Sequence, residues 1–359
     1  MTISYQLLDT AKRGSLPEGD LPFGALRTDH MFVADYKDGA WQNARIVPYG
    51  PFQLMPGAMC LHYGQTIFEG AKAYIHPDGE LYGFRVDENA KRFNHSAGVL
   101  LMPEVPEELF MDGLMRLLDV DRDWCPKVPE SSLYIRPFAF ATQDSLGVKP
   151  SREYTFCIML SPSGPYYKGG FSKALRLLIT GSYHRAVSGG TGTSKCGGNY
   201  AASLRAADHA IKNGCDQVLY LDANNAFIEE VGTMNHYHVL KDGTFVIPAF
   251  NDSILRSVTS LSVLELGRLG KIKAKSEPIA LDDFLAKVRS GEIVEAGGFG
   301  TAAVVSPVGS YLLEDGTELT VGSGSIGKHS MDLYTFYSGM QVGKNPAPEG
   351  WLQKVPHYQ

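Results

Sequence analysis

A cluster of proline, glycine and serine interrupts the chain near its middle, at residues 162–172 (PSGPYYKGGFS). Proline and glycine are disfavoured inside helices and strands, so such a cluster is typical of a loop or a linker. The chain has 359 residues, more than a single hydrophobic core normally serves. We therefore predict two α/β or α+β domains that meet at this linker, and a cleft between domains is a usual place for a ligand.

The composition is that of a globular protein with an acidic balance, because 44% of the residues are hydrophobic, 20% are charged and the formal net charge is −6. This balance argues against nucleic acid or an anionic membrane as a partner, since both favour basic surfaces. Residues 1–21 lack the apolar core of a signal peptide, and no apolar run approaches the roughly 20 residues of a membrane span. Five scattered cysteines without a C-x-x-C pair indicate reduced thiols and a cytoplasmic location.

Hydrophobic spacing predicts strands and helices in both halves, without the strict alternation of a Rossmann fold. Runs rich in β-branched and aromatic residues predict strands at 132–142, 153–161, 174–183 and 217–221. Helical spacing of apolar residues predicts helices at 87–101, 107–118, 199–212, 258–269 and 327–340. Asp87 is the predicted cap of the first helix.

The most informative segment is 189–202 (GGTGTSKCGGNYAA), where a lone lysine, Lys195, lies among glycines between a predicted strand and a predicted helix. A phosphate-binding P-loop requires glycine before this lysine and serine or threonine after it, but Ser194 and Cys196 occupy those positions. A solvated loop lysine stays open as an alternative. Glycines on both sides let the backbone approach a flat cofactor, and a desolvated lysine becomes neutral enough to form a Schiff base. Tyr200 could offer its phenol to a ring oxygen.

Two adjacent carboxylates, Glu229 and Glu230, lie in the otherwise apolar segment 226–235 (AFIEEVGTMN). If the segment is a strand, the two side chains point to opposite faces. One is then solvated, while the other faces the interior and needs a positive partner. A pyridinium nitrogen would supply that partner, and a pair of ordinary edge-strand charges is the alternative.

Two further segments have the features of anion-binding sites. Ser257, Val258 and Thr259 open a predicted helix, whose N-terminus presents free amides and a partial positive charge. Simple capping by Ser257 is compatible with this role. Residues 297–303 (GGFGTAA) place Thr301 in a glycine-rich turn that can offer a hydroxyl and backbone amides to an anion.

Taken together, these motifs resemble the branched-chain amino-acid aminotransferases, which are pyridoxal-phosphate enzymes of fold type IV. Eight segments in the same order carry the resemblance: FGALRTDHMF (23–32), LHYGQTIFEGAKAY (61–74), FRVDENAKRF (84–93), LYIRPFAFAT (133–142), GTSKCGGNYAASL (192–204), GCDQVLYLD (214–222), EEVGTMN (229–235) and GTAAVVSPVG (300–309). It implies an α/β (α+β) fold with a smaller N-terminal domain (1–165), a linker (166–173) and a larger C-terminal pseudo-barrel domain (174–359), with the cofactor in the cleft. It also implies transamination of leucine, isoleucine and valine with 2-oxoglutarate.

The resemblance assigns a role to each candidate site residue. Lys195 matches the Schiff-base lysine and Glu230 the carboxylate that faces the pyridine nitrogen, which leaves Glu229 on the solvent side. The other residues matched to pyridoxal phosphate are Tyr200 at O3′, Thr233 near the ring, and Arg92, Val258, Thr259 and Thr301 at the phosphate. The matched substrate pocket comprises Phe23, Tyr63, Phe68, Tyr134, Arg136, Thr233, Thr301 and Ala302. In the family a loop of the partner subunit closes this pocket; here it corresponds to Leu146–Val148 and implies a homodimer.

The sequence departs from the family pattern at several places. Animal members carry a redox-active C-x-x-C pair where this chain has Ala303 and Ser306, so that switch is expected to be absent. The helix entry usually has proline and glycine, but here it reads Arg256-Ser257. His236 and His238 stand where apolar residues are more common; without a third ligand at useful spacing, we predict a structural role and no metal.

The sequence also disfavours several other functions, on this fold and on another. D-amino-acid aminotransferases and aminodeoxychorismate lyases share the lysine and the glutamate, but the segments EGAKAY (69–74) and LYIRPF (133–138) argue against both. Ser194 disfavours an ATP-binding P-loop protein. A non-catalytic binding protein on this fold would be expected to lack Lys195 or Glu230, and both are present.

Overall fold

The computed structural model of the chain describes residues 1–164 and 173–358. The chain forms two compact units: the first comprises 1–168, 194–197 and 338–359, and the second comprises 169–193 and 198–337. The units are therefore interleaved along the sequence, whereas the prediction assigned one continuous segment to each domain. Most of the predicted linker lies outside the described residues, and its first two residues, Pro162 and Ser163, end a strand instead.

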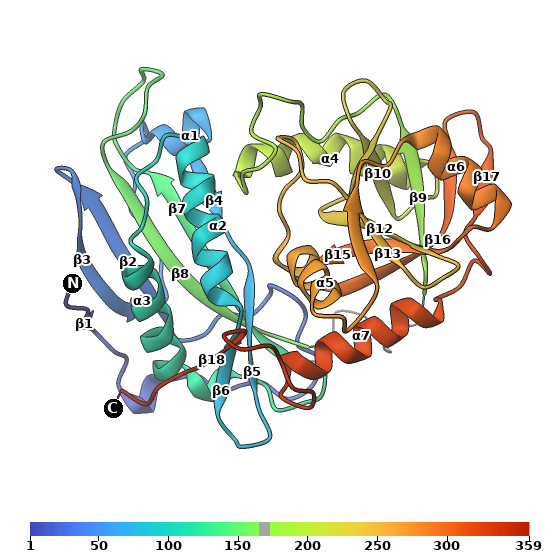
Figure 1. Cartoon of the computed structure of the whole chain (residues 1–359). Helices are drawn as coiled ribbons and strands as arrows, with labels where there is room; N and C mark the ends of the chain where they lie inside the picture. Colours follow the sequence, from blue (N-terminus) through green and yellow to red (C-terminus); the bar gives the residue numbers. More distant parts are fainter. Residues whose placement is uncertain (165–172, 359) are drawn as a thin grey trace. The chain divides into compact units, whose positions relative to one another are not determined.

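The first unit contains a sheet in the strand order β1–β3–β2–β8–β7–β5–β6–β18, with β4 paired to β7 (Figure 1). Its strands are β1 Ser4–Tyr5, β2 His30–Lys37, β3 Ala40–Pro48, β4 Thr66–Phe68, β5 Ala71–Ile75, β6 Leu81–Phe84, β7 Ser132–Ala141, β8 Tyr154–Ser163 and β18 Leu352–Lys354. Strands β2 and β3 form a hairpin through Asp38 and Gly39, which both have positive φ, as a type I′ hairpin turn requires.

Two helices of the first unit, α2 (Val86–Val99) and α3 (Glu107–Val120), pack against each other and cover one face of this sheet (Figure 1). The core between them and the sheet contains the rings of Phe93, Phe110 and Phe156, with centroids 5.2–5.7 Å apart. The prediction that Asp87 caps α2 is wrong. Arg85 is the N-cap, and Asp87 lies in the first turn, where its carboxylate accepts a hydrogen bond from Gln353.

The shorter helices of the first unit are α1 (Met59–Tyr63) and the 3-10 turns η1 (Thr10–Lys12) and η2 (Arg122–Trp124). Helix α1 lies against β7. Residue Ala58, just before α1, bridges to Asp144 in the loop after β7. This bridge brings α1 close to the predicted partner-closing loop.

The second unit contains a sheet in the order β11–β10–β9–β16–β15–β12–β13–β14, with β17 paired to β16. An additional pairing of β11 with β12 closes six of these strands into a barrel, which confirms the pseudo-barrel expected from the resemblance. The strands are β9 Leu175–Thr180, β10 Gln217–Leu221, β11 Ile228–Val231, β12 Met234–Leu240, β13 Phe245–Pro248, β14 Ala274–Glu277, β15 Ile293–Gly300, β16 Val304–Leu313 and β17 Glu318–Thr320.

Strand β9 runs parallel to its neighbours β10 and β16, and this arrangement determines where the lysine loop lies. Parallel strands need a long crossover connection. Between β9 and β10 this connection contains the glycine-rich loop and helix α4 (Gly197–Lys212). The remaining helices are α5 (Val258–Arg268), α6 (Leu281–Ser290) and α7 (Lys328–Gln341), and the apolar face of α6 packs on the barrel around Phe284.

The strands and helices predicted from hydrophobic spacing are confirmed within a few residues. The predicted strands correspond to β7, β8, β9 and β10, and the predicted helices to α2, α3, α4, α5 and α7. Segment 226–235 is a hairpin rather than one strand, because Gly232 adopts positive φ and turns the chain from β11 into β12.

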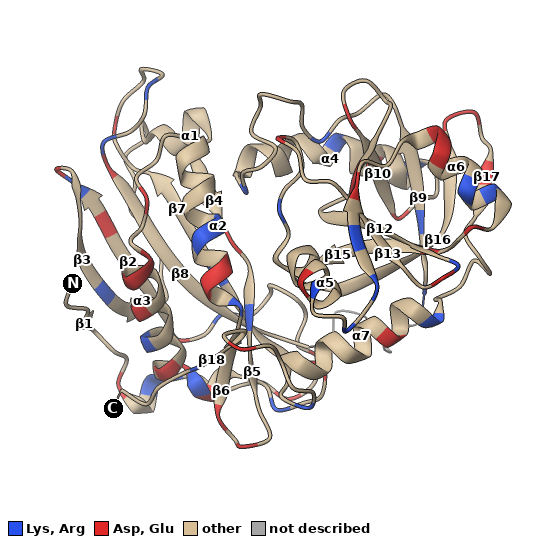
Figure 2. Cartoon of the chain, viewed as in Figure 1, with Lys and Arg blue, Asp and Glu red and all other residues tan. Residues whose placement is uncertain are grey.

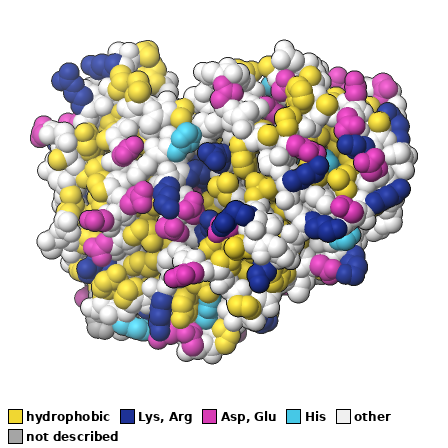
Figure 3. Space-filling model, in the orientation of Figure 1, with side chains coloured by type: hydrophobic (Ala, Val, Ile, Leu, Met, Phe, Trp, Pro, Cys, Tyr) yellow, Lys and Arg dark blue, Asp and Glu magenta, His cyan; other side chains and the backbone are white. Residues whose placement is uncertain are grey.

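Charged residues of both signs are interspersed along both units (Figure 2), and the face drawn in Figure 3 mixes charged with apolar side chains. Across residues 1–164 and 173–358, no helix combines the length and hydrophobicity needed to cross a membrane.

Candidate active site

Lys195 is fixed through its backbone to strand β4 and helix α2 of the first unit. The Phe68 amide donates to the Lys195 carbonyl at 3.0 Å, and the Lys195 amide donates to the Ser96 hydroxyl at 2.9 Å. Cys196 bridges to Ile67. The Lys195 side chain is half-buried, and its Nζ lies 4.7 Å from the centre of the Phe68 ring. A freely solvated loop lysine would lack these constraints.

Arg92, predicted at the phosphate, lies on α2 in a two-point ion pair with Glu69. The Arg92 Nε and Nη2 atoms donate to the two Glu69 oxygens at 2.6 and 2.8 Å, and Asn89 donates to Glu69 at 2.8 Å. Burial alone would raise the pKa of Glu69, but the charge and hydrogen bonds of Arg92 and the charge of Lys195 hold this pKa below its usual value. Sequence reasoning missed Glu69, although a carboxylate in the apolar run IFEGAKA was a usable signal.

Four predicted substrate residues, Phe23, Phe68, Tyr134 and Arg136, lie together in the first unit. Tyr134 and Arg136 alternate on β7 and share one face, as predicted, and Arg136 donates to the Tyr134 hydroxyl at 3.1 Å. The Phe23 ring meets Tyr134 edge-on with centroids 4.8 Å apart. The Arg136 guanidinium carbon lies 5.0 Å from the Phe68 ring centre, and its buried Nε has no hydrogen-bond partner among the described residues. These four side chains, called the substrate wall below, thus combine aromatic surface with a guanidinium whose hydrogen-bonding capacity is only partly used.

Tyr63 lies with the loop predicted to close the partner's site. Its hydroxyl donates to the carbonyl of Leu146. The side chains of Leu146 and Val148 are 72% and 84% exposed in the single chain. These residues form an apolar group at the surface of the first unit.

Glu230, Tyr200 and Thr233 lie together in the second unit, around a cavity of about 10 Å³ that they line with Arg185. Glu230 is on β11, Thr233 is in the following turn and Tyr200 is in the first turn of α4. Arg185 Nε lies 3.0 Å from a Glu230 oxygen, with both side chains more than nine-tenths buried. Sequence reasoning missed Arg185, because nothing in its local pattern distinguishes it from a surface arginine.

The prediction that Glu229 faces solvent is wrong, because its side chain is only 2% exposed. The loop after β13 covers it, and there Ser253 and Asn251 donate to one Glu229 oxygen. The alternation of the two glutamates on β11 was correct in principle. Asn251 and Ser253, more than 20 positions further along the chain, cover the Glu229 side of this strand.

Val258 and Thr259 are the first two residues of α5, so their amides lack acceptors within the helix. Ser257 caps the helix as predicted, and its hydroxyl accepts from the Ser260 amide. Thr301 and Ala302 lie in the turn between β15 and β16. Next to this turn Val304 has a φ of 64°, which is strained for a β-branched residue, and such strain concentrates at functional sites.

His236 and His238 are buried side by side on β12, with Nε2 and Nδ1 3.4 Å apart. Both rings contact Phe284 of α6. Within the described part of the chain, no group of three or more His, Cys, Asp or Glu side chains is arranged to hold a metal ion.

Comparison with known proteins places these motifs in one family. Residues 66–311 match the family model of class IV amino-transferases. A probable branched-chain-amino-acid aminotransferase of Staphylococcus epidermidis is 45% identical over 97% of this chain and 98% of its own length. Branched-chain-amino-acid transaminase 1 of Bacillus subtilis is 46% identical over 93% of this chain and 94% of its own length. Among solved structures, a T.th. branched-chain amino acid aminotransferase with pyridoxamine 5'-phosphate superposes with a TM-score of 0.72 and 26% identity, over 90% of this chain and 98% of its own.

Proposed function

Because the chain belongs to the class IV aminotransferases, we propose that it transfers the amino group of L-leucine, L-isoleucine and L-valine to 2-oxoglutarate, giving branched-chain 2-oxo acids and L-glutamate. The names of relatives about 45% identical over nearly the whole chain support this substrate class and disfavour D-amino acids. The observation that carries the proposal is the position of Phe68. Its ring centre lies 4.7 Å from Lys195 Nζ and 5.0 Å from the Arg136 guanidinium carbon. The amine proposed to react and the cation proposed to bind a carboxylate therefore lie next to the same aromatic ring.

The proposed cofactor is pyridoxal 5'-phosphate, and similar enzymes were solved with this cofactor or its amine form. The donor set fits it: an amine at Lys195, a carboxylate at Glu230, a phenol at Tyr200, and for the phosphate a cation at Arg92 and free amides at the start of α5. When bound, it supplies a carbonyl for the substrate amine and a ring that accepts electrons from the substrate Cα.

Lys195 binds the cofactor covalently through Nζ and acts as the base in each half-reaction. Its Nζ would accept the proton from the substrate Cα in one half-reaction and would deliver a proton to the Cα of the new amino acid in the other. The backbone bonds at Phe68 and Ser96 keep the amine in place while it alternates between these two tasks.

Glu230 holds the proton at the ring nitrogen in this proposal. The Leu255 amide donates to one of its oxygens at 2.7 Å, and Arg185 pairs with the other, so both oxygens of this buried carboxylate have a partner. Tyr200 and Thr233, which line the same small cavity, orient the ring through hydrogen bonds.

Arg92 binds the phosphate together with the amides of Val258 and Thr259 and with Thr301. Because Glu69 occupies one edge of the guanidinium, Arg92 is held in one orientation. Free amides at a helix N-terminus favour an anion through both hydrogen bonding and the helix dipole.

The substrate wall must accept a branched apolar side chain and a carboxylate in turn. Phe23, Phe68 and Tyr134 supply apolar surface, and Arg136 at their edge supplies the charge for 2-oxoglutarate. The Thr301–Ala302 turn provides backbone amides for the α-carboxylate.

The active form is a homodimer in which Leu146 and Val148 close the site of the partner. Two large apolar side chains exposed by 72% and 84% are costly on an isolated chain, and burial against a second copy removes this cost. The hydrogen bond from the Tyr63 hydroxyl to the Leu146 carbonyl attaches this loop to the end of α1.

The proposed location is the cytoplasm. All five cysteines are unpaired thiols, as a reducing compartment requires. Burial raises the pKa of Cys125 to about 12, which keeps this thiol protonated and unreactive.

The purified protein should carry a cofactor absorbance band that Lys195→Ala abolishes or displaces. A colourless wild-type protein that cannot be reconstituted with pyridoxal phosphate would contradict the cofactor assignment. Assays with L-leucine and D-alanine as donors separate the proposed activity from that of a D-amino-acid aminotransferase. A panel of 2-oxo-acid acceptors with L-glutamate as donor then ranks the substrates.

A further inference from the structure

The side chain of Asn235 contacts two parts of the second unit that have different proposed roles. Its Nδ2 donates to a Glu230 oxygen at 3.3 Å and to the Leu255 carbonyl at 2.9 Å. Its Oδ1 accepts from the Ser257 amide at 3.3 Å and the Ser260 hydroxyl at 2.8 Å. Glu230 is the proposed partner of the ring nitrogen, and Ser257 and Ser260 flank the two amides proposed to bind the phosphate.

This carboxamide is buried and makes four hydrogen bonds. Asn235 lies opposite Glu230 in the β11–β12 hairpin and is 3% exposed. Two donations and two acceptances use the full ordinary capacity of an amide side chain. Because the amide group is planar and rigid, a shift of its oxygen toward α5 also moves its nitrogen relative to Glu230.

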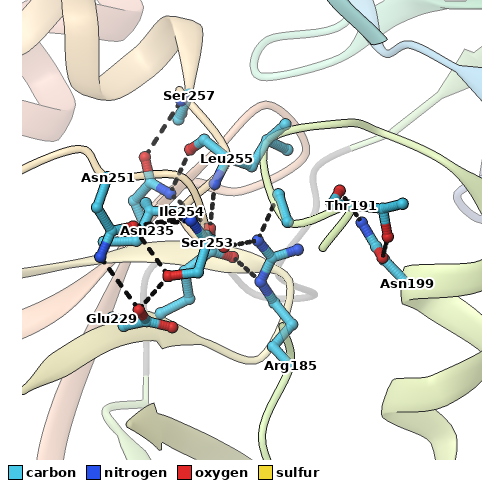
Figure 4. Close-up of polar contacts among 12 residues, drawn as sticks. Arg185, Thr191, Asn199, Glu229, Asn235, Asn251, Ser253, Ile254, Leu255 and Ser257 are labelled. Atoms are coloured by element: carbon cyan, nitrogen blue, oxygen red, sulfur yellow. Dashed lines mark hydrogen bonds and ion pairs between the residues drawn. The ribbon is translucent and has the colours of Figure 1, made fainter. Parts of the chain in front are cut away.

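Surrounding contacts limit the other ways in which this region can move (Figure 4). Arg185 bonds to the carbonyls of Gly192 and Ser253 at 2.8 and 2.6 Å as well as pairing with Glu230. A Cβ at Gly192 would lie 2.5 Å from the Ser253 Cα, so glycine is needed for this approach. Asn251 holds the Ser253 and Ile254 amides at 3.0 Å each. These bonds thus attach the loop from Asn251 to Ser257 to the barrel and to the start of α5.

We propose that Asn235 is a positioning residue that couples the ring-nitrogen site at Glu230 to the phosphate site at the N-terminus of α5. A phosphate at α5 fixes Ser257 and Ser260, and through Asn235 it also fixes the orientation of the Glu230 carboxylate. Occupancy of either site therefore raises the affinity of the other, since such coupling is reciprocal. This inference rests on the proposed function, because pyridoxal phosphate is the ligand that spans both sites.

The test separates the two ends of the cofactor. The cofactor-free protein is titrated with pyridoxal, which lacks the phosphate, with and without saturating inorganic phosphate, and the dissociation constant is followed by absorbance. In the wild type, phosphate is expected to lower this constant about fivefold or more. In Asn235→Ala the ratio should fall to about one. Ser262→Ala is the matched control: it removes a buried hydroxyl that bonds to the Val258 carbonyl in the same helix, and it should keep the wild-type ratio.

Each outcome decides one question. An unchanged ratio in Asn235→Ala, or no phosphate effect in a wild type that does bind pyridoxal phosphate, overturns the coupling. Failure of the wild type to bind pyridoxal phosphate overturns the proposed function instead. If Asn235→Ala does not fold, Ser260→Ala removes one of the two bonds between Asn235 and α5 and should reduce the ratio. A wild-type ratio in Ser260→Ala would overturn the inference.

Discussion

The two carboxylate oxygens of Glu69 accept hydrogen bonds from the guanidinium of Arg92 at 2.6 and 2.8 Å, and Glu69 is fully buried. Through this pair, a residue on the segment after β4 orients a cation on α2. The pair also makes the first unit sensitive to the loss of one charge.

Glu69→Ala should therefore destabilise the protein by about 3 kcal/mol, because it leaves a buried guanidinium without its anion. The measurement is the free energy of unfolding in urea. Asp112→Ala is the matched control: it breaks the partly exposed pair with Arg116, which should cost less than about 1 kcal/mol. An equal loss of unfolding free energy in the two variants would show that the buried Glu69–Arg92 pair stabilises the protein no more than the Asp112–Arg116 pair.

The buried pair His236 and His238 should make the protein less stable in mild acid. Burial lowers the pKa of His236 well below its usual value, with a further contribution from His238. Burial, and then the charges of Lys287 and Lys275 against the opposing effect of Asp283, lower the pKa of His238 to about 3. Both rings stay neutral in the folded protein at pH 5, whereas in the unfolded chain they gain protons below about pH 6.5. Stability is therefore complete above pH 6.5 and falls as the pH drops below it.

From pH 7 to pH 5 this effect should cost about 2 kcal/mol per histidine. Urea unfolding at the two pH values measures it, and His236→Leu should remove about half of the combined loss. His95→Gln, at an exposed position on α2, should leave the pH dependence unchanged. The idea fails if His236→Leu and the wild type lose the same stability on acidification.

Val148→Asp should convert the proposed dimer to monomer, since a carboxylate in an apolar interface loses its hydration without gaining a partner. Sedimentation velocity at micromolar concentration reads the result directly. Val128→Asp is the control: it changes an exposed valine in another loop of the first unit, and this variant should remain dimeric. A Val148→Asp variant that sediments like the wild type would remove this loop from the interface.

Arg136→Met should separate the two substrates. Loss of a charged hydrogen bond of about 1.5–3 kcal/mol corresponds to roughly a 10- to 150-fold fall in kcat/KM for 2-oxoglutarate. The kcat/KM for L-leucine should fall much less, because the side chain of leucine carries no charge for Arg136 to bind. Steady-state kinetics with each substrate varied at a fixed concentration of the other gives both values. Equal losses for the two would indicate that Arg136 supports the wall without recognising the carboxylate.

Local patterns were enough to predict several of the longer strands and most of the longer helices, in their order along the chain. The alternation in 132–142 gave β7 with Tyr134 and Arg136 on one face, and the apolar stripe in 107–118 gave α3. The position of Lys195 between a strand and a helix was equally visible. Such features depend on neighbours within about four residues, which the sequence displays directly.

Contacts between distant segments were not visible in the same way. Asp87 has the chemistry of a cap, but the chain enters α2 through Arg85 and the C-terminal strand recruits Asp87. Glu229 alternates with Glu230 as expected, yet a loop more than 20 residues away buries it.

The sequence by itself determined the family and many of the helices and strands, and it predicted Lys195 as the reactive amine. The tertiary structure alone decided the partners of the charged groups: Glu69 for Arg92, Arg185 for Glu230, and Asn235 between Glu230 and α5. The physical reason is that a buried charge or amide must find its partner wherever the fold brings one. That place depends on sheet register and loop closure, and no local periodicity encodes either of them.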